Sequence, residues 1–426
     1  MARATGVHRT GRGATLTTYA AVIAFTIILS AGAVLLGYRA ATAPEPPPRA
    51  LDAPSTLPAS PDTEPAAAVT DALAGGPTRL QIVGPRPLMD TATPLPAGVE
   101  VNVPLPALPT DTRALLVEMS LRDAGAPGIV TVRTNVEETA ALRLPAPGAM
   151  TSATVVTLID GDEALRVRTQ GGGRLIVTLL GVFQPAESAT SGRIVTLPAQ
   201  PVLKLTPKVD GNDAVIDVAA LPALRGAGSM SAVLLNLDGD VGTHGGFVAM
   251  GPSGGRLSQQ VYWGATQGTD RTRHGFIVVP VAAGRLHLQY HAGTQLRVEI
   301  AGYVTGDGAA QSADGLVVPV PASGAQSVTV AAGGKAAVPV IPAEETAVAP
   351  ERVEAALVGV LATAQAQGGV SVRTPSATPA GGATLSAAGK PRSMLALSGV
   401  ENGSVSVTSQ IGATVVVTPR ALVLKG

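Results

Sequence analysis

The sequence contains no cysteine, and its 426 residues include only one Trp, five Tyr and four Phe. Without cysteine, a disulfide framework and a thiolate-ligated metal site are both excluded. Charged residues make up 14%, well below the roughly 25% that is usual for soluble domains. The 30 basic residues balance the 30 acidic ones, so the charge gives no reason to expect nucleic acid as a partner.

Beyond the first forty residues, long segments with helical periodicity are also missing. The chain has 50 Gly and 35 Pro, which break helices and join short strands by tight turns. Many stretches of five to eight residues, such as VEVNVPLP at Val99–Pro106, alternate between apolar and polar side chains as half-buried strands do. We predict an all-β fold class with tandem antiparallel β-sandwich domains, which follow an N-terminal transmembrane helix and a Pro-rich linker.

Two landmarks recur at constant spacing along the chain. An apolar strand begins at Ala114, Ala232 and Ala355, and a Gly-led strand follows at Gly128, Gly246 and Gly369. Both landmarks move by 118 residues from the first copy to the second and by 123 from the second to the third. We therefore predict three domain-sized β-sandwich repeats, at residues 79–187, 191–307 and 315–426, of which the third is degenerate.

The first forty residues contain the longest apolar run. Residues 16–38 carry no charge, and Arg3, Arg9 and Arg12 precede them. A helix of this length crosses a bilayer core of roughly 30 Å, and the basic residues favour an N-terminus inside. We predict a cytoplasmic tail at 1–15 and a transmembrane helix at 16–38, with the cytoplasmic membrane as its partner. The alternative is a signal peptide cleaved near Ala43 and a secreted product.

Residues 39–78 are rich in Pro, with Ala, Ser, Thr and Asp between. Pro removes backbone donors and fixes φ, so we predict a disordered, extended stalk. At 3.1 Å per residue its reach is on the order of 100 Å.

The membrane anchor and the cleaved signal peptide both predict that most of the chain lies outside the cytoplasm.

The second repeat carries a set of short motifs in a recognisable order. They are AVLLNL at Ala232–Leu237, GFVAMGP at Gly246–Pro252, SQQVY at Ser258–Tyr262, the turn of Val279–Val281 with Gly284, and VEIAGY at Val298–Tyr303. The first repeat adds RPLMDT at Arg86–Thr91 and LLGVF at Leu179–Phe183. In these motifs the chain resembles a β-rich repeat of secreted and surface proteins of actinobacteria. The resemblance implies an accessory surface module without catalysis, and it is poor after Leu316, where the closing Gly-aromatic pair is missing.

The few aromatic residues gather in the second repeat. Tyr262 and Trp263, with Tyr290 and Tyr303, form the only aromatic cluster of the sequence. Tyr262 and Tyr303 fall on recurrent positions of the resembled family, which favours a core role for them. Trp263 lies outside that pattern, so Trp263, with Tyr262 beside it, is the candidate ligand-binding surface for a sugar.

Other polar groups have weaker claims to a function. His287 and His291 share one face of a strand, but the local sequence supplies no third metal ligand, so we predict surface or edge histidines. The acidic segments IDGDE, from Ile159, and LDGD, from Leu237, have the composition of tight turns rather than the full spacing of a calcium loop. We predict no metal site.

No serine lies in a nucleophile-elbow context, and neither a phosphate loop nor a zinc-protease motif occurs. We therefore predict a non-enzymatic protein without catalytic residues or cofactors, with a role in adhesion, spacing or scaffolding in the cell envelope. One alternative is a module that binds carbohydrate or cell wall through the second repeat. Another is a subunit that recruits an envelope enzyme through its membrane helix.

Overall fold

The computed structural model describes residues 76–426, except 145–149, 206–211, 241–245, 253–258, 264–271, 292–294, 343–347, 365, 367, 374–382 and 387–390. Beside several of these gaps it describes the backbone alone. The chain divides into two units, Met1–Glu64 and Pro65–Gly426, and all described residues belong to the second. The predicted tail, the membrane helix and the stalk up to residue 75 lie outside the described residues. No described helix is long and apolar enough to cross a membrane.

The prediction of an all-β, antiparallel fold is confirmed for the described residues. Their only helices are three single 3-10 turns, η1 (Pro222–Leu224), η2 (Ala322–Gly324) and η3 (Pro350–Arg352). Strands of 3–13 residues form five sheets, and the described strand pairs are all antiparallel. Pro and Gly occur in many of the connections between the strands, where they permit tight turns, as the composition suggested.

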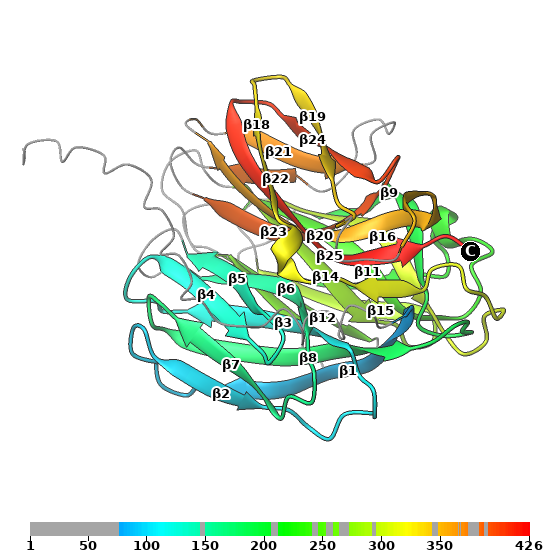
Figure 1. Ribbon diagram of the computed structural model, residues 1–426, viewed down its shortest axis with the longest axis horizontal. Helices are drawn as coiled ribbons and strands as arrows, with labels where there is room; N and C mark the ends of the chain where they lie inside the picture. The colour runs from blue at the N-terminus through cyan, green and yellow to red at the C-terminus, as the bar shows by residue number, and fades with distance from the viewer. Residues whose placement is uncertain are drawn as a thin grey trace, which may run out of the picture. The chain divides into compact units, whose positions relative to one another are not determined.

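The first eight strands form a pair of four-stranded sheets, which we call repeat 1 (Figure 1). They are β1 (Thr78–Asp90), β2 (Glu100–Pro104), β3 (Ala114–Arg122), β4 (Gly128–Arg133), β5 (Glu138–Leu144), β6 (Thr151–Leu158), β7 (Ala164–Thr169) and β8 (Arg174–Pro185). The inner sheet has the order β1-β8-β3-β6, and the outer sheet has the order β2-β7-β4-β5. This order is that of an eight-stranded jelly roll.

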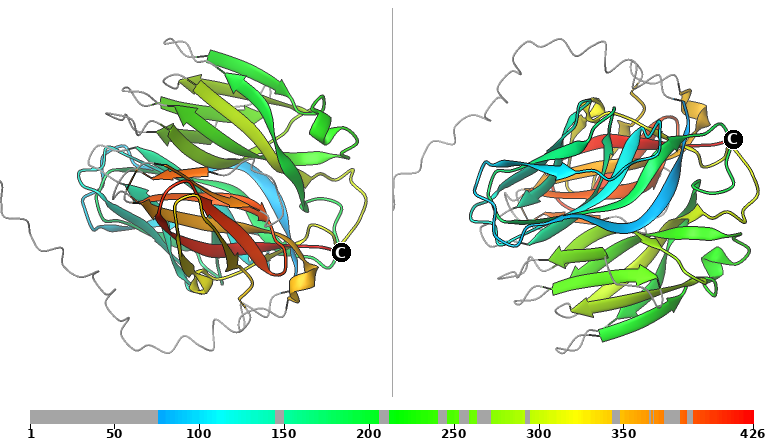
Figure 2. Two further views of the ribbon diagram at one scale, coloured as in Figure 1. Left: turned by 90° about the horizontal axis from the view of Figure 1, so that it is seen from above. Right: turned by 90° about the horizontal axis from the view of Figure 1, so that it is seen from below.

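Strands β9 to β16, repeat 2, repeat this order and are drawn in green in Figure 2. They are β9 (Ile194–Leu205), β10 (Asn212–Asp217), β11 (Met230–Asp240), β12 (Gly246–Pro252), β13 (Gln259–Trp263), β14 (Thr272–Pro280), β15 (Arg285–His291) and β16 (Gln295–Thr305). The inner sheet is β9-β16-β11-β14, and the outer sheet is β10-β15-β12-β13.

Strands β18 to β25, repeat 3, have the same order again. They are β18 (Gln326–Val330), β19 (Lys335–Pro339), β20 (Val353–Ala364), β21 (Gly368–Arg373), β22 (Ala383–Ser386), β23 (Arg392–Gly399), β24 (Ser404–Ser409) and β25 (Ala413–Leu424). An additional short strand, β17 (Val317–Pro319), pairs with both β1 and β25. It joins the inner sheets of repeats 1 and 3 into one sheet of nine strands.

The inner sheets are buried on both faces. In β3, Leu115, Val117 and Met119 point into the core of their own repeat, while Ala114 and Leu116 belong to a different cluster. The strands β11 and β20 divide their side chains in the same way. A strand with two buried faces reads as a continuous apolar run rather than an alternation. The runs ALLV, AVLL and AALV at the starts of these strands show that signal.

The second cluster, which we call the central core, contains residues of all three repeats. Its fully or almost fully buried members are Leu80, Ala114, Leu116, Val156, Leu158, Leu180, Phe183, Ile194, Ala232, Leu234, Phe276, Val278, Val304, Val317, Ala355, Leu357, Leu395, Ala421 and Val423. Each repeat therefore has a core of its own and a share in a fourth core. Since apolar burial is the main favourable term in folding, the three repeats stabilise one another.

The last inner strand of each repeat carries a β-bulge at one equivalent place. The register of β8 skips Leu180, that of β16 skips Ala301, and that of β25 skips Arg420. In repeat 2 the residue after the bulge is Gly302, where an added Cβ would lie 2.6 Å from the carbonyl oxygen of Val195. The glycine of the closing VEIAGY motif is therefore explained by close backbone packing rather than by function.

The central core predicts that the described body unfolds in a single cooperative transition. Replacing Leu234 with alanine removes a fully buried side chain from that core, and such substitutions cost about 2–5 kcal/mol. We expect the Leu234→Ala variant of the full chain to lower one common melting transition in calorimetry. Val215→Ala on β10, where the side chain is 61% exposed, is the matched control. Three separate transitions, with only one of them shifted, would contradict the shared core.

Candidate functional site

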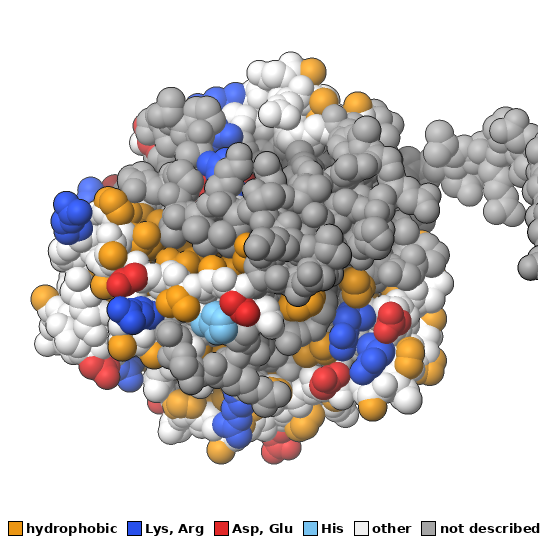
Figure 3. All heavy atoms as spheres, turned by 180° about the vertical axis from the view of Figure 1, so that it is seen from behind, with side chains coloured by type: hydrophobic (Ala, Val, Ile, Leu, Met, Phe, Trp, Pro, Cys, Tyr) orange, Lys and Arg blue, Asp and Glu red, His pale blue; other side chains and the backbone are white. Residues whose placement is uncertain are grey.

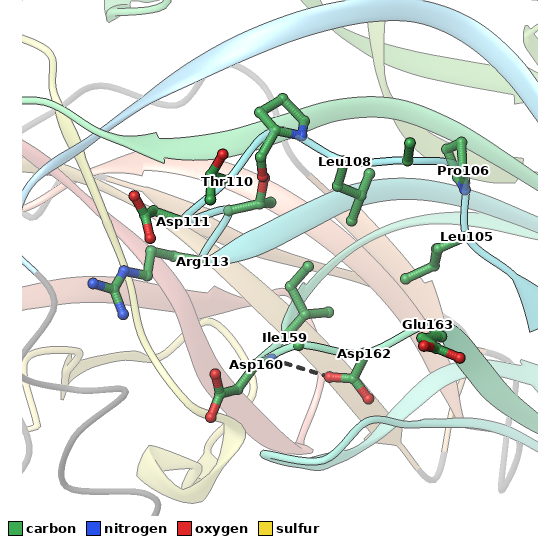
Figure 4. A pocket seen from close by; sticks show the side chains of 14 residues that line it. Leu105, Pro106, Leu108, Thr110, Asp111, Arg113, Ile159, Asp160, Asp162 and Glu163 are labelled. Carbon is green, nitrogen blue, oxygen red and sulfur yellow. Dashed lines mark hydrogen bonds between the residues drawn. The ribbon is translucent and has the colours of Figure 1, made fainter.

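A pocket of about 790 Å³ lies at one end of repeat 1 (Figure 4). Two segments line it, the connection between β2 and β3 at 105–113 and the turn between β6 and β7 at 159–163. Figure 4 shows Leu108 and Ile159 pointing toward each other, with Asp160 and Asp162 below them. The pocket thus has an apolar back wall and an acidic edge.

The acidic edge is a turn held by its own carboxylate, as the sequence predicted for IDGDE. Asp162 Oδ2 accepts a hydrogen bond from the Asp160 amide at 3.0 Å, and Gly161 between them has φ +62°. Asp162 Oδ1 accepts another from the Asn135 amide at 2.8 Å, and Asn135 Nδ2 donates to the Asp160 carbonyl at 3.1 Å. Asp162 therefore ties two loops together. The structure explains these acidic residues by turn formation.

The prediction of a second acidic turn, at LDGD, is wrong. Asp238 and Asp240 lie within β11, which runs straight through to Asp240. Asp238 contacts His274 Nδ1 on the neighbouring strand β14, and the two residues are direct partners in the β11–β14 pairing. Aspartate and glycine are common in turns, but here the strand continues because its ladder partners on β14 and β16 continue.

Asp238 and His274 belong to a charged cluster in repeat 2 that extends toward repeat 3. Glu299 on β16 is 1% exposed and forms an ion pair with Arg297. Burial raises the pKa of Glu299, and Asp238 raises it further, while Arg297, His274 and Arg373 of repeat 3 lower it. Burial also lowers the pKa of Arg373, and Glu299 opposes that shift. The cluster is therefore a partly compensated set of charges close to repeat 3.

A separate polar contact joins repeat 1 to repeat 3. Arg420, the bulge residue of β25, donates a hydrogen bond to Thr139 Oγ1 at 2.6 Å and lies 3.7 Å from Glu137 Oε2. Glu137 also accepts hydrogen bonds from the backbone amides of Leu158, at 2.9 Å, and Ala322, at 3.0 Å. Burial lowers the pKa of Arg420, and Glu137 opposes this shift. Because both side chains are buried, this pair fixes the registration of the two repeats.

The candidate ligand residues lie on β13, an edge strand of the outer sheet of repeat 2. The Trp263 backbone pairs with Gly246, and that of Tyr262 pairs with Phe247. Their side chains lie outside the described residues, so their role in ligand binding stays a prediction. Tyr290 is buried in the core of repeat 2, and Tyr303 packs against that core from a partly buried position.

The histidines differ from one another. His287 Nε2 lies 3.2 Å from Asp213 Oδ1 on β10, with 30% of its side chain exposed. His274 lies on the edge strand β14 of the inner sheet, and its side chain is only 8% exposed. The His291 side chain and all of His244 lie outside the described residues. Within the described part of the chain, no group of three or more metal-ligating side chains converges.

Sequence reasoning missed the buried charges. Glu299 was read only as part of the closing VEIAGY motif, and Arg420 and Glu137 did not stand out at all. For Glu299 and Arg420 a signal was present, because each is a charged residue inside an apolar strand of an inner sheet. Reading it required knowing that the inner sheets have two buried faces.

The surface carries both signs of charge. On the face in Figure 3, the described Lys and Arg side chains are scattered among Asp, Glu and apolar ones. Neither sign gathers into a field over the described part of this face, which agrees with the balanced composition.

The comparisons with known proteins give no family. No family model matches the chain, and no curated protein matches it. Among solved structures, the one titled "The Triple Jelly Roll Fold and Turret Assembly in an Archaeal Virus" is 9% identical, with 82% of this chain and 90% of that chain covered and a TM-score of 0.16. Another, titled "Crystal Structure of the STIV MCP", is 8% identical, with 51% and 96% covered and a TM-score of 0.17. Likenesses this weak carry no argument about function.

The raised pKa of Glu299 predicts a pH dependence of stability. The folded state holds the Glu299 proton to higher pH than the unfolded state, whose value lies near 4.5. The stability from this group is therefore present in full below about pH 4.5 and is lost as pH rises through the folded pKa. We expect Glu299→Gln to gain unfolding free energy relative to the native chain as pH rises from about 4 to about 8.

The measurement is urea unfolding of both proteins across that pH range. Glu401→Gln, at an exposed turn residue, is the control and should follow the native curve. A constant difference between Glu299→Gln and the native chain at every pH would contradict the assignment.

Proposed function

We propose that this chain is a membrane-anchored extracytoplasmic protein with a structural or interaction role in the cell envelope, and that it is not an enzyme. Adhesion, spacing and scaffolding are the roles considered. The jelly-roll body is the presented part, the Pro-rich stalk at 39–78 is its spacer, and the uncharged segment 16–38 is its anchor. In this proposal the body is three tandem copies of the surface-protein module that the sequence resembles.

The observation that carries the proposal is the central core. Three jelly rolls that share a core form a rigid platform rather than flexible beads, and rigid β scaffolds present ligands and partners with their loops. The buried Arg420–Glu137 pair described above joins repeats 1 and 3. The surfaces left for a partner are then the parts of the outer sheets that do not face another repeat, and the loop ends, such as the pocket of repeat 1.

The membrane topology is testable with the full chain carrying a C-terminal epitope tag in a Gram-positive host. We expect the tag to fractionate with membranes and to be digested by external protease in protoplasts, because the basic N-terminus stays inside. Replacing residues 16–38 with an unrelated membrane helix should preserve both results. Protection of the tag from protease would contradict the proposal. Loss of a partner enzyme on helix exchange, with anchoring unchanged, would favour the recruiting subunit.

The alternative function is binding of carbohydrate or cell wall by repeat 2. The observation that favours it is the position of Trp263 at the end of an outer-sheet edge strand. If it holds, the detergent-solubilised full chain should be retained on purified wall glycan. Trp263→Ala should then lose about 5- to 150-fold in affinity, since aromatic stacking on a ligand ring contributes roughly 1–3 kcal/mol. Val215→Ala on the same sheet is the control. Equal retention of both variants would exclude Trp263 as the contact.

A further inference from the structure

A cavity of about 300 Å³ lies between repeats 1 and 3, next to the Arg420–Glu137 pair. It borders β20 at Gly359, which occupies the register position of Glu118 in repeat 1 and Asn236 in repeat 2. An added Cβ at Gly359 would have its nearest neighbours at 3.7 Å, an ordinary contact distance. The glycine is therefore not required by close packing, and the space beside it is where the other repeats place a polar side chain.

The walls of the cavity are of two kinds. Leu361 and Val416 of repeat 3 contribute apolar surface, and Leu395 belongs to the central core. Ser393 and Thr418 add hydroxyl groups. At about 300 Å³ the cavity is at the lower limit for small-molecule sites and holds the equivalent of roughly ten water molecules. Such a lining fits a small ligand with an apolar body and a polar end.

The two arginines that line the cavity differ in whether an acidic residue pairs with them. Arg420 is compensated by Glu137, as described above. Arg143, on the edge strand β5 of repeat 1, lines the same cavity and is half-buried. Its guanidinium makes no hydrogen bond or ion pair with any described residue, and burial alone lowers its pKa. A guanidinium that is partly removed from water is normally paired with an anion, and no described residue supplies one for Arg143.

We propose that this cavity binds a small amphipathic monocarboxylate, with its carboxylate on Arg143 and its short apolar body against Leu361 and Val416. A guanidinium pairs with a carboxylate through two parallel hydrogen bonds, and the hydroxyls of Ser393 and Thr418 are further donors. Glu138, which is exposed and also lines the cavity, repels a second negative charge. A monoanion is therefore favoured over phosphate, and a neutral apolar ligand would leave Arg143 unpaired.

The test uses the full chain in nanodiscs and sodium hexanoate as the probe, followed by isothermal titration and by thermal unfolding. We expect hexanoate to bind and to raise the melting temperature, while equal concentrations of sodium chloride or 1-hexanol do not. Arg143→Gln should weaken hexanoate binding at least tenfold. Arg168→Gln, which removes an exposed arginine on β7 of the same outer sheet, should bind like the native chain.

A second variant tests the cavity without altering charge. Gly359→Val should weaken hexanoate binding at least tenfold by filling the space, and should keep the fold because β-branched residues suit strands. Absence of hexanoate binding to the native chain would overturn the proposal. So would an unchanged affinity in both Arg143→Gln and Gly359→Val. Neither result bears on membrane topology or glycan retention, so the proposed function is tested separately.

Discussion

The arrangement of the described body depends on the burial of three inner sheets on both of their faces. A four-stranded sheet in an isolated jelly roll can expose its outer face to water, and the strands then alternate between apolar and polar residues. Here the second face carries Leu116, Leu234 and Leu357, one from each repeat, and these meet in the central core. Removing any one repeat would expose the apolar faces of the other two. The repeats therefore stabilise one another through the central core. The same core holds in place the outer sheets and loops that are attached to the inner sheets.

Where the central core ends, the repeats meet through polar contacts, and each junction uses a different one. Repeats 1 and 2 are joined by Thr154, whose hydroxyl donates to the Phe276 carbonyl at 2.6 Å. Repeats 1 and 3 are joined by the buried Glu137–Arg420 pair, and the Glu299 cluster lies near Arg373 of repeat 3. Buried charges contribute less net stability than apolar packing, but breaking a pair is costly. The apolar core therefore supplies the driving force, and we expect the polar contacts to favour one pairing of the repeats over others.

The strands could be predicted because their signals are local. Apolar runs, period-two stretches and turn residues such as Gly284, with φ +72°, mark them directly in the sequence. The buried polar contacts could not be predicted, because their partners lie far apart, by 36 residues for Asp238 and His274 and by 281 for Arg420 and Thr139. LDGD was mistaken for a turn because composition is a weak guide where ladder partners continue. Trp263 and Tyr262 were selected for their rarity, which says nothing about exposure.

Gly359 shows how a repeated fold can acquire a site by sequence change at one register position. A glycine inside a strand costs about 0.5–1 kcal/mol relative to alanine, and here it also leaves an unfilled space against apolar walls. Its neighbours, at 3.7 Å or more, would accept a larger side chain, and the equivalent residues of the other repeats are larger. Packing alone therefore favours a replacement of this glycine. Gly359 and Arg143, the one guanidinium that lines this cavity without a described partner, border the same space, which is the arrangement expected where an anionic ligand completes the structure.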